Sequence, residues 1–127
     1  MANFSTYTRQ AIANWLRGNA AMPAQAQPYV SLWNGDPTDG GSDVTATIRP
    51  AGRVAVTFGA PTDGAMANST AVDFGAADAG ASVSHYALHD AATDGNMLGS
   101  VALDASKVVN AGDPVSFPIG DLTADVD

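Results

Sequence analysis

The chain has 127 residues, which allow one compact domain and leave no room for a second independent core. Its 46% hydrophobic content is enough to bury that core, so wholesale disorder is excluded. The formal net charge of -8 argues against nucleic acid as a partner, and the lack of cysteine excludes disulfides and thiolate chemistry.

Neither a membrane span nor a secretion signal is apparent along the chain. No apolar run approaches the roughly 20 residues that cross a bilayer. The first residues lack a basic region followed by an apolar stretch. We therefore expect a cytosolic, unprocessed chain with no membrane partner.

The first predicted element is a helix over residues 4–17. Ser5 or Asn3 is suited to cap its start, and Gly18 to end it. An apolar stripe follows from three residues spaced four apart: Tyr7, Ala11 and Trp15. We expect this stripe to pack on the chain's own sheet, and the alternative is that it docks on a partner.

After a connector at residues 19–28, short segments with alternating apolar and polar residues fill residues 29–127. Their spacing of about ten residues is typical of a β-sandwich or jelly roll. The predicted strands are residues 29–33, 53–58, 71–74, 83–89, 97–103, 107–109, 114–117 and 122–126. The chain is therefore predicted to be a single all-β domain, an antiparallel, jelly-roll-like β-sandwich with one N-terminal α-helix.

A Thr-Asp-Gly motif occurs three times, within Pro37–Gly40, Pro61–Gly64 and Ala92–Gly95. Asp-Gly supplies the positive-φ residue of a tight turn, and Pro suits the first central position of a type I turn. These three segments are predicted to be hairpin ends.

Residues for catalysis or metal binding are sparse, since the chain has no Glu and a single Lys, Lys107. His85 and His89 lie on a predicted strand, where four residues span roughly 13 Å, too far to share one ion. The acidic run Asp36–Asp43 lacks the ligand order of a calcium loop, and no serine lies in a nucleophile elbow. We predict no catalytic residue, no cofactor and no metal site, and a protein that is not an enzyme.

A partner interface is the remaining candidate site. Arg49 and Arg53 place two of the five basic residues within five positions, next to the polar loop Asn34–Ile48. In so acidic a chain, this local positive charge indicates a contact with a partner. The helix stripe of Tyr7, Ala11 and Trp15 is the second candidate.

Four stretches of the chain resemble a known family. They are residues 29–39 (YVSLWNGDPTD), 52–61 followed by 68–74, 83–98, and 110–117 continuing through 121–127. Together they resemble a family of small tailed-phage virion proteins usually labelled phage tail fibre protein, and residues 83–98 are the most specific part. The resemblance implies a compact β domain without catalytic residues, closer to a capsid decoration or cement protein than to a long, repetitive fibre.

The predicted function is therefore that of a non-enzymatic bacteriophage virion structural protein, a capsid decoration or cement protein on the outside of the head. A tail fibre or tail attachment component is the alternative within the same class. A carbohydrate- or host-surface-binding module is an alternative of another class, with Trp33 or Tyr29 as its stacking platform. The expected partners are the major capsid protein or other virion subunits. We expect a homo-oligomer on a particle assembled in the host cytoplasm.

Overall fold

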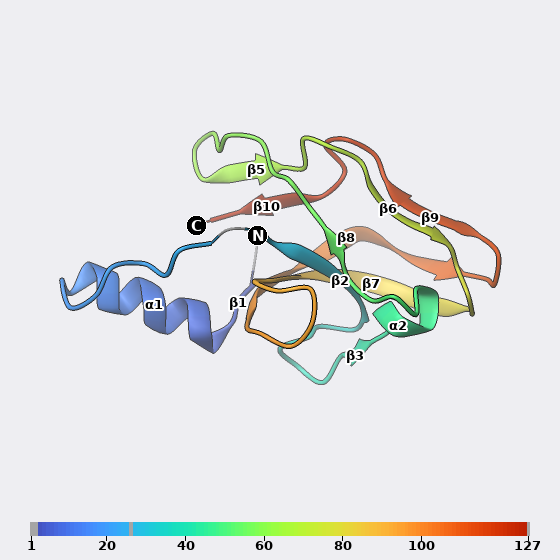
Figure 1. Ribbon diagram of the computed structural model, residues 1–127, viewed down its shortest axis with the longest axis horizontal. Helices are drawn as coiled ribbons and strands as arrows, with labels where there is room; N and C mark the ends of the chain where they lie inside the picture. The colour runs from blue at the N-terminus through green and yellow to red at the C-terminus, as the bar shows by residue number, and fades with distance from the viewer. Residues whose placement is uncertain (1–2, 26, 127) are drawn as a thin grey trace.

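The computed structural model describes residues 3–25 and 27–126 (Figure 1). Residues 1–2, 26 and 127, which the predicted domain, connector and sandwich include, lie outside the described residues. The elements of the described residues, in chain order, are β1 (Asn3–Phe4), α1 (Thr6–Leu16), β2 (Tyr29–Asn34), β3 (Ser42–Asp43), α2 (Thr45–Ile48), β4 (Val54–Ala55), β5 (Ala65–Ala67), β6 (Val72–Ala76), β7 (Ala81–His89), β8 (Met97–Val109), β9 (Pro114–Phe117) and β10 (Thr123–Asp125).

The strands form two layers. The first is an antiparallel sheet in the order β1-β8-β7-β2-β3, with β4 also pairing with β2. The second consists of two antiparallel ladders, β6 with β9 and β5 with β10, which lie across the first sheet in Figure 1. The predicted antiparallel all-β fold with one N-terminal helix is confirmed.

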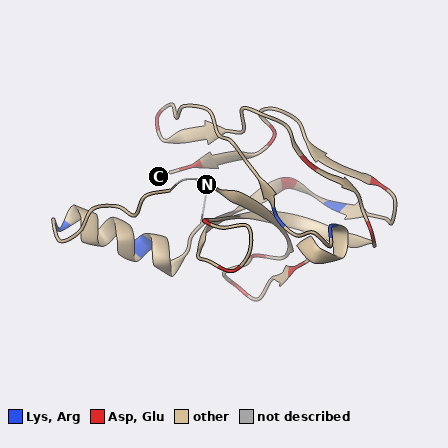
Figure 2. Cartoon of the chain, in the orientation of Figure 1, with Lys and Arg blue, Asp and Glu red and all other residues tan. Residues whose placement is uncertain are grey.

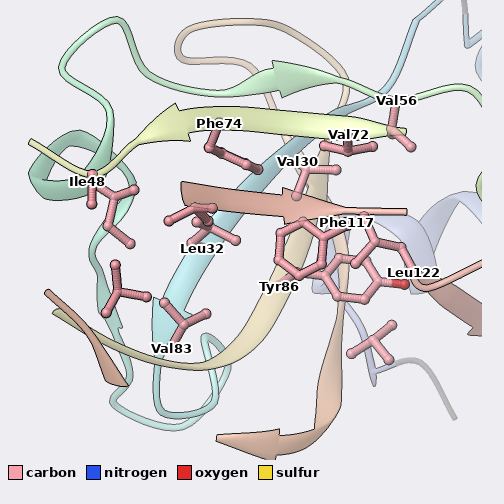
Figure 3. Close-up of a cluster of buried hydrophobic side chains, with 14 of the residues drawn as sticks. Val30, Leu32, Ile48, Val56, Val72, Phe74, Val83, Tyr86, Phe117 and Leu122 are labelled. Carbon is pink, nitrogen blue, oxygen red and sulfur yellow. The ribbon is translucent and has the colours of Figure 1, made fainter. Parts of the chain in front are cut away.

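The core lies between these layers, and its buried strand residues come from β2, β6, β7, β8, β9 and β10 (Figure 3). In β9, and in β6 as far as Phe74, every second side chain is buried, as the two-residue period of a half-buried strand requires. Phe74 and Phe117 meet edge to face there, with ring centroids 6.2 Å apart. Ile48 of α2 is also fully buried and closes the core at the side of Phe74 (Figure 3).

Two buried polar side chains connect the core to the segment that leads into β10. Asn68 is 1% exposed, and its amide donates to the carbonyls of Thr70 at 2.8 Å and Pro118 at 3.0 Å. Its Oδ1 accepts a hydrogen bond from the Leu122 N–H at 3.0 Å. The Tyr86 hydroxyl, which comes from the opposite layer, donates to the Thr123 carbonyl at 2.6 Å. The C-terminal segment is thereby fixed to both layers.

The three Thr-Asp-Gly motifs lie at chain reversals, as predicted. Pro37–Gly40 connects the paired strands β2 and β3, and Ala92–Gly95 connects β7 and β8. In Pro61–Gly64, Thr62 bridges to Ala65 across the turn. Asp63 and Asp94 have φ values of 55° and 53°, and the glycine after each also has positive φ. This left-handed pair is the backbone that Asp-Gly favours.

The predicted packing of the helix stripe on the sheet is confirmed for Tyr7 and Ala11, which lie beside Leu98 and Val101 of β8, and is wrong for Trp15. Every side chain of α1, all of it within the described residues, is exposed or half-buried, and Trp15 is 55% exposed. Only the first turn is anchored, because Ser5 caps it and Thr8 Oγ1 donates to the Leu98 carbonyl at 2.7 Å. The second layer already covers the apolar face of the sheet, so α1 projects from one end of the body (Figure 1).

Several predicted boundaries also differ. The helix begins at Thr6 because Asn3 and Phe4 pair with β8 as a strand. The segments at residues 97–103 and 107–109 form one continuous strand, β8, whereas residues 53–58 contribute only the two-residue strand β4. The sequence did not predict β1, β3, α2 or β5. All four have four residues or fewer, too few for a periodic pattern.

Replacing Asn68 should destabilise the domain strongly. Asn68→Ala leaves a buried N–H and two carbonyls without their partner, and each such group costs about 1–3 kcal/mol. We expect the free energy of unfolding in urea to fall by at least about 2 kcal/mol. Thr70→Ala is the control, because only the Thr70 backbone carbonyl is used. An equal effect of both substitutions would contradict this role for the Asn68 side chain.

Candidate functional site

A buried polar cluster lies on the first sheet, where β2 and β7 pair. Ser31 Oγ is 2.7 Å from His89 Nε2, and Trp33 Nε1 donates to the same Oγ at 2.8 Å. Ser31 Oγ thus accepts one hydrogen bond from Trp33 and makes a second one with the His89 ring. Ser31 is fully buried, so no substrate reaches it, and the Ser-His contact is structural.

The environment of His89 favours its neutral form. Burial lowers its pKa to about 4, and the positive charge of nearby Arg53 acts in the same direction. The side chain is only 5% exposed. At neutral pH the ring is therefore uncharged.

The other residues considered for metal binding have separate local partners. His85 Nδ1 is 2.8 Å from Ser84 Oγ. Asp36 Oδ1 accepts from the Thr38 N–H at 2.9 Å, and this bond lowers the pKa of the Asp36 carboxyl. That geometry is an Asx turn. In residues 3–25 and 27–126, no three His, Asp, Glu or Cys side chains are grouped so that they could hold a metal ion.

Arg49 and Arg53 lie together, and both guanidinium groups bond to carbonyls of their own chain. Arg49 Nη1 donates to the Gly52 and Arg53 carbonyls at 2.9 and 3.0 Å. Arg53 Nη1 donates to the Ala91 and Asp94 carbonyls, each at 2.9 Å, and so holds the β7–β8 turn. Both side chains are half-buried. Their predicted contact with a partner stays a prediction, beside this structural role that the sequence did not indicate.

The aromatic residues considered for sugar stacking are not freely exposed. Tyr29 and Trp33 are both half-buried on β2, and the Trp33 indole N–H is bonded to Ser31. A stacking platform needs an open ring face with its polar edge available to the ligand. The structure thus gives the carbohydrate-binding alternative little support.

An apolar cleft lies between α1, the connector and the open end of the sandwich. Its volume is about 240 Å³. On one side, the lining includes Phe4 of β1 and Tyr7 and Ala11 of α1. On the other side, it includes Leu88 and Val101 of the first layer, Met66 and Ala124 of the second, and Val126. The cleft is therefore an incompletely covered end of the hydrophobic core.

The charges are unevenly distributed between this N-terminal arm, defined here as residues 3–25, and the body, residues 27–126. Figure 2 shows basic but no acidic residues on the arm. The arm carries Arg9 and Arg17, whereas all 13 acidic residues of the chain lie at position 36 or beyond. Asp125 of β10 does not line the cleft but a separate hollow that it shares with Thr62, Ala65 and Thr123. The arm is thus basic and the body strongly acidic.

The sequence identified only one side of this cleft. The helical spacing of Tyr7 and Ala11 marked them as interface candidates, and both line the cleft, whereas Trp15 lies further along α1 and stays exposed. The body residues of the opposite wall are far apart in sequence. They meet only through the pairing of β7 with β8 and β5 with β10, for which no local pattern exists.

The match to a known protein family covers nearly the whole described chain. Residues 3–125 match the family described as podophage GP4 fiber I protein gp80. The chain belongs to this family. It is accordingly a phage fibre-type protein and a structural component of the virion, and the resemblance to small tailed-phage proteins is confirmed. No curated protein matches the chain. Neither helix of the described residues has the length and apolarity needed to cross a bilayer.

Stability should fall in acid because of His89. Its pKa is about 4 in the folded protein and 6.5 when unfolded, so between these values only the unfolded chain binds the proton. Stability is then full above about pH 6.5 and declines as pH falls towards 4, by about 3 kcal/mol in total. Urea denaturation across this range measures the decline. His89→Gln should flatten it and His85→Gln should not, and an unchanged slope in His89→Gln would contradict the assignment.

Loss of Arg53 should loosen the β7–β8 turn. Arg53→Gln removes two hydrogen bonds from a charged donor in a half-exposed setting, and we expect a loss of about 1 kcal/mol in unfolding free energy. Hydrogen exchange of residues 90–96 should accelerate. Arg17→Gln is the matched control, because the only hydrogen bond found for the Arg17 side chain within the described residues is to Asn14 of the same helix. Equal protection of residues 90–96 in both variants would rule out the bracing role.

Proposed function

We propose that the chain is a non-enzymatic structural subunit attached to the outside of a podophage virion through its N-terminal arm. One observation carries this proposal. The body buries its own core, whereas the arm projects from it with exposed aromatic and aliphatic side chains beside an apolar cleft. Exposed apolar surface of this kind marks an assembly site.

A fibre subunit is the form of this function that the family description favours. A fibre subunit needs a compact exposed domain and a means of joining neighbouring subunits, and the acidic body and the arm supply these two parts. The negative body suits the exterior of a particle, because it repels nucleic acid and keeps the surface soluble. Other virion subunits are then the partners.

Capsid decoration is the second candidate. A small β-rich body of this kind suits a subunit that covers a shell in many copies. On that alternative, the major capsid protein is the partner and the same arm forms the contact. The two candidates differ in where the subunit binds and in how many copies each particle carries.

Copy number and position on the particle should separate these candidates. Symmetric attachment of fibres gives roughly a dozen to a few dozen copies, whereas decoration of the head gives hundreds. Quantitative mass spectrometry of purified virions counts the copies, and immunogold labelling locates them. We expect the lower number, with label at discrete attachment points. Uniform label on the head with hundreds of copies would favour decoration, and absence from purified virions would contradict both.

A further inference from the structure

The three Thr-Asp-Gly turns differ in how firmly the rest of the molecule holds them. In each turn an aspartyl carboxyl group precedes a glycine, which has no side chain to shield its backbone nitrogen from that carboxyl group. The carboxyl carbon and this nitrogen can join into a cyclic imide when the backbone between them is free to rotate. The contacts that restrict each turn therefore decide which of the three can react.

The turn between β7 and β8 is fixed by other parts of the chain. The Asp94 carbonyl accepts a hydrogen bond from Arg53 Nη1 at 2.9 Å. The Asn96 N–H donates to the Asp90 carboxylate at 2.7 Å, and a side chain added at Gly95 would collide with the same carboxylate. Rotation of the peptide group between Asp94 and Gly95 would break these contacts, so this turn is protected.

The turn that precedes β5 is also fixed. Thr62 and Ala65 exchange two backbone hydrogen bonds across it, of 2.8 and 2.9 Å. The Gly64 carbonyl accepts from the Val126 N–H at 2.8 Å, and a side chain added at Gly64 would collide with the Val126 carbonyl. Asp63 therefore lies in a turn that is closed on itself and bonded to the segment that follows β10.

The turn between β2 and β3 is held only by its own loop, as far as the described residues show. The N–H groups of Asp39 and Gly41 share one acceptor, the Asp36 carbonyl, at 3.0 and 2.8 Å. Asp39 and Gly40 are both exposed, and a side chain added at Gly40 would meet no atom within 4 Å. Within residues 3–25 and 27–126, no hydrogen bond is found for the Asp39 carboxylate or the Gly40 N–H. These two groups are therefore the ones with freedom to meet.

We propose that Asp39–Gly40 is a site of spontaneous isomerisation, with water as its only co-reactant. The Gly40 nitrogen attacks the Asp39 carboxyl carbon, so that a C–N bond forms. The C–OH bond of the protonated carboxyl group breaks, and the hydroxyl leaves as water with the amide hydrogen. Water then adds to one carbonyl of the imide and breaks one of its two C–N bonds. Cleavage at the former carboxyl carbon restores Asp39, whereas cleavage at the main-chain carbonyl carbon leaves the chain running through the aspartyl side chain.

Isomerisation lengthens the main chain of the turn by one carbon atom and leaves the composition of the protein unchanged. The longer turn should lose the bond from the Gly41 N–H to the Asp36 carbonyl. The Asp36 carboxylate accepts a hydrogen bond from Asn3 of β1 at 3.2 Å. The altered loop therefore contacts the base of the N-terminal arm.

Incubation of the full-length native chain in water enriched in heavy oxygen tests the proposal. Each hydrolysis of the imide inserts one heavy oxygen atom, whichever C–N bond breaks. Digestion with trypsin in ordinary water then separates residues 18–53, which contain Asp39, from residues 54–107, which contain Asp63 and Asp94. Fragment masses locate the label within each peptide. We expect incorporation at Asp39 to be about tenfold faster or more, because the other two turns must first open locally. In concentrated urea, all three positions should react at similar rates.

Three variants sharpen this experiment. Asp39→Glu keeps the charge, but its longer side chain forms a larger ring more slowly, so label at position 39 should be lost. Asp104→Glu is the matched control, because Asp104 is exposed on β8 and precedes an alanine. It should leave incorporation at Asp39 unchanged. Arg53→Gln should raise incorporation at Asp94, since it removes a bond that holds that turn.

The proposal is overturned if the folded chain incorporates heavy oxygen at Asp39 no faster than at Asp63 and Asp94. It is also overturned if the folded chain gains no label at Asp39 while the chain in urea does. Undiminished label at position 39 in Asp39→Glu would show that the imide is not its source, with the same consequence. None of these outcomes depends on where the chain lies on a particle, so the isomerisation and the proposed function can fail independently.

Discussion

The attachment of the C-terminal segment to both layers is the constraint on which the rest of the structure depends. Asn68 accepts from the Leu122 N–H through its side chain, and its own N–H donates to the Leu122 carbonyl at 3.1 Å. Tyr86 reaches the next residue, Thr123, from the opposite sheet. Burial of the Tyr86 ring raises the pKa of its hydroxyl, which therefore stays a donor. These bonds hold β10 over the core, and Leu122 is fully buried beneath them.

Because the two layers of the body cover each other, α1 contacts the body only near its start, where Tyr7 and Ala11 line the cleft, among the residues that the structure describes. An amphipathic helix ordinarily gains its stability from burial of its apolar stripe. Here only Ser5 and Thr8 fasten the first turn of α1, and its far end lies in solvent. An eleven-residue helix is marginal by itself, so a partner that covers Trp15 and Leu16 would supply the burial that the body does not. The exposed arm thus connects this fold to the assembly role that we propose.

Much of the fold could be predicted because its signals are local. Alternation in β6 and β9, and Asp-Gly at the turns, depend on neighbouring residues and were read correctly. The direction in which α1 points depends on whether the sheet is already covered, which no local pattern encodes. The contacts of Asn68, and of Ser31 with His89, join residues about 50 positions apart, so residue type alone did not predict them. The same limit applies to the cleft, whose body wall exists only after the strands have paired.

On the proposed function, the body keeps its fold without support from α1, and the arm becomes ordered when it binds its partner. Hydrogen exchange of the native chain, measured once in dilute solution and once on assembled particles, tests it most directly. In dilute solution, the amides of α1 should exchange far faster than those of the central strand β7. On the particle, α1 should gain protection while β7 changes little. Equal protection of α1 and β7 in dilute solution, or an arm that stays unprotected on the particle, would contradict the account.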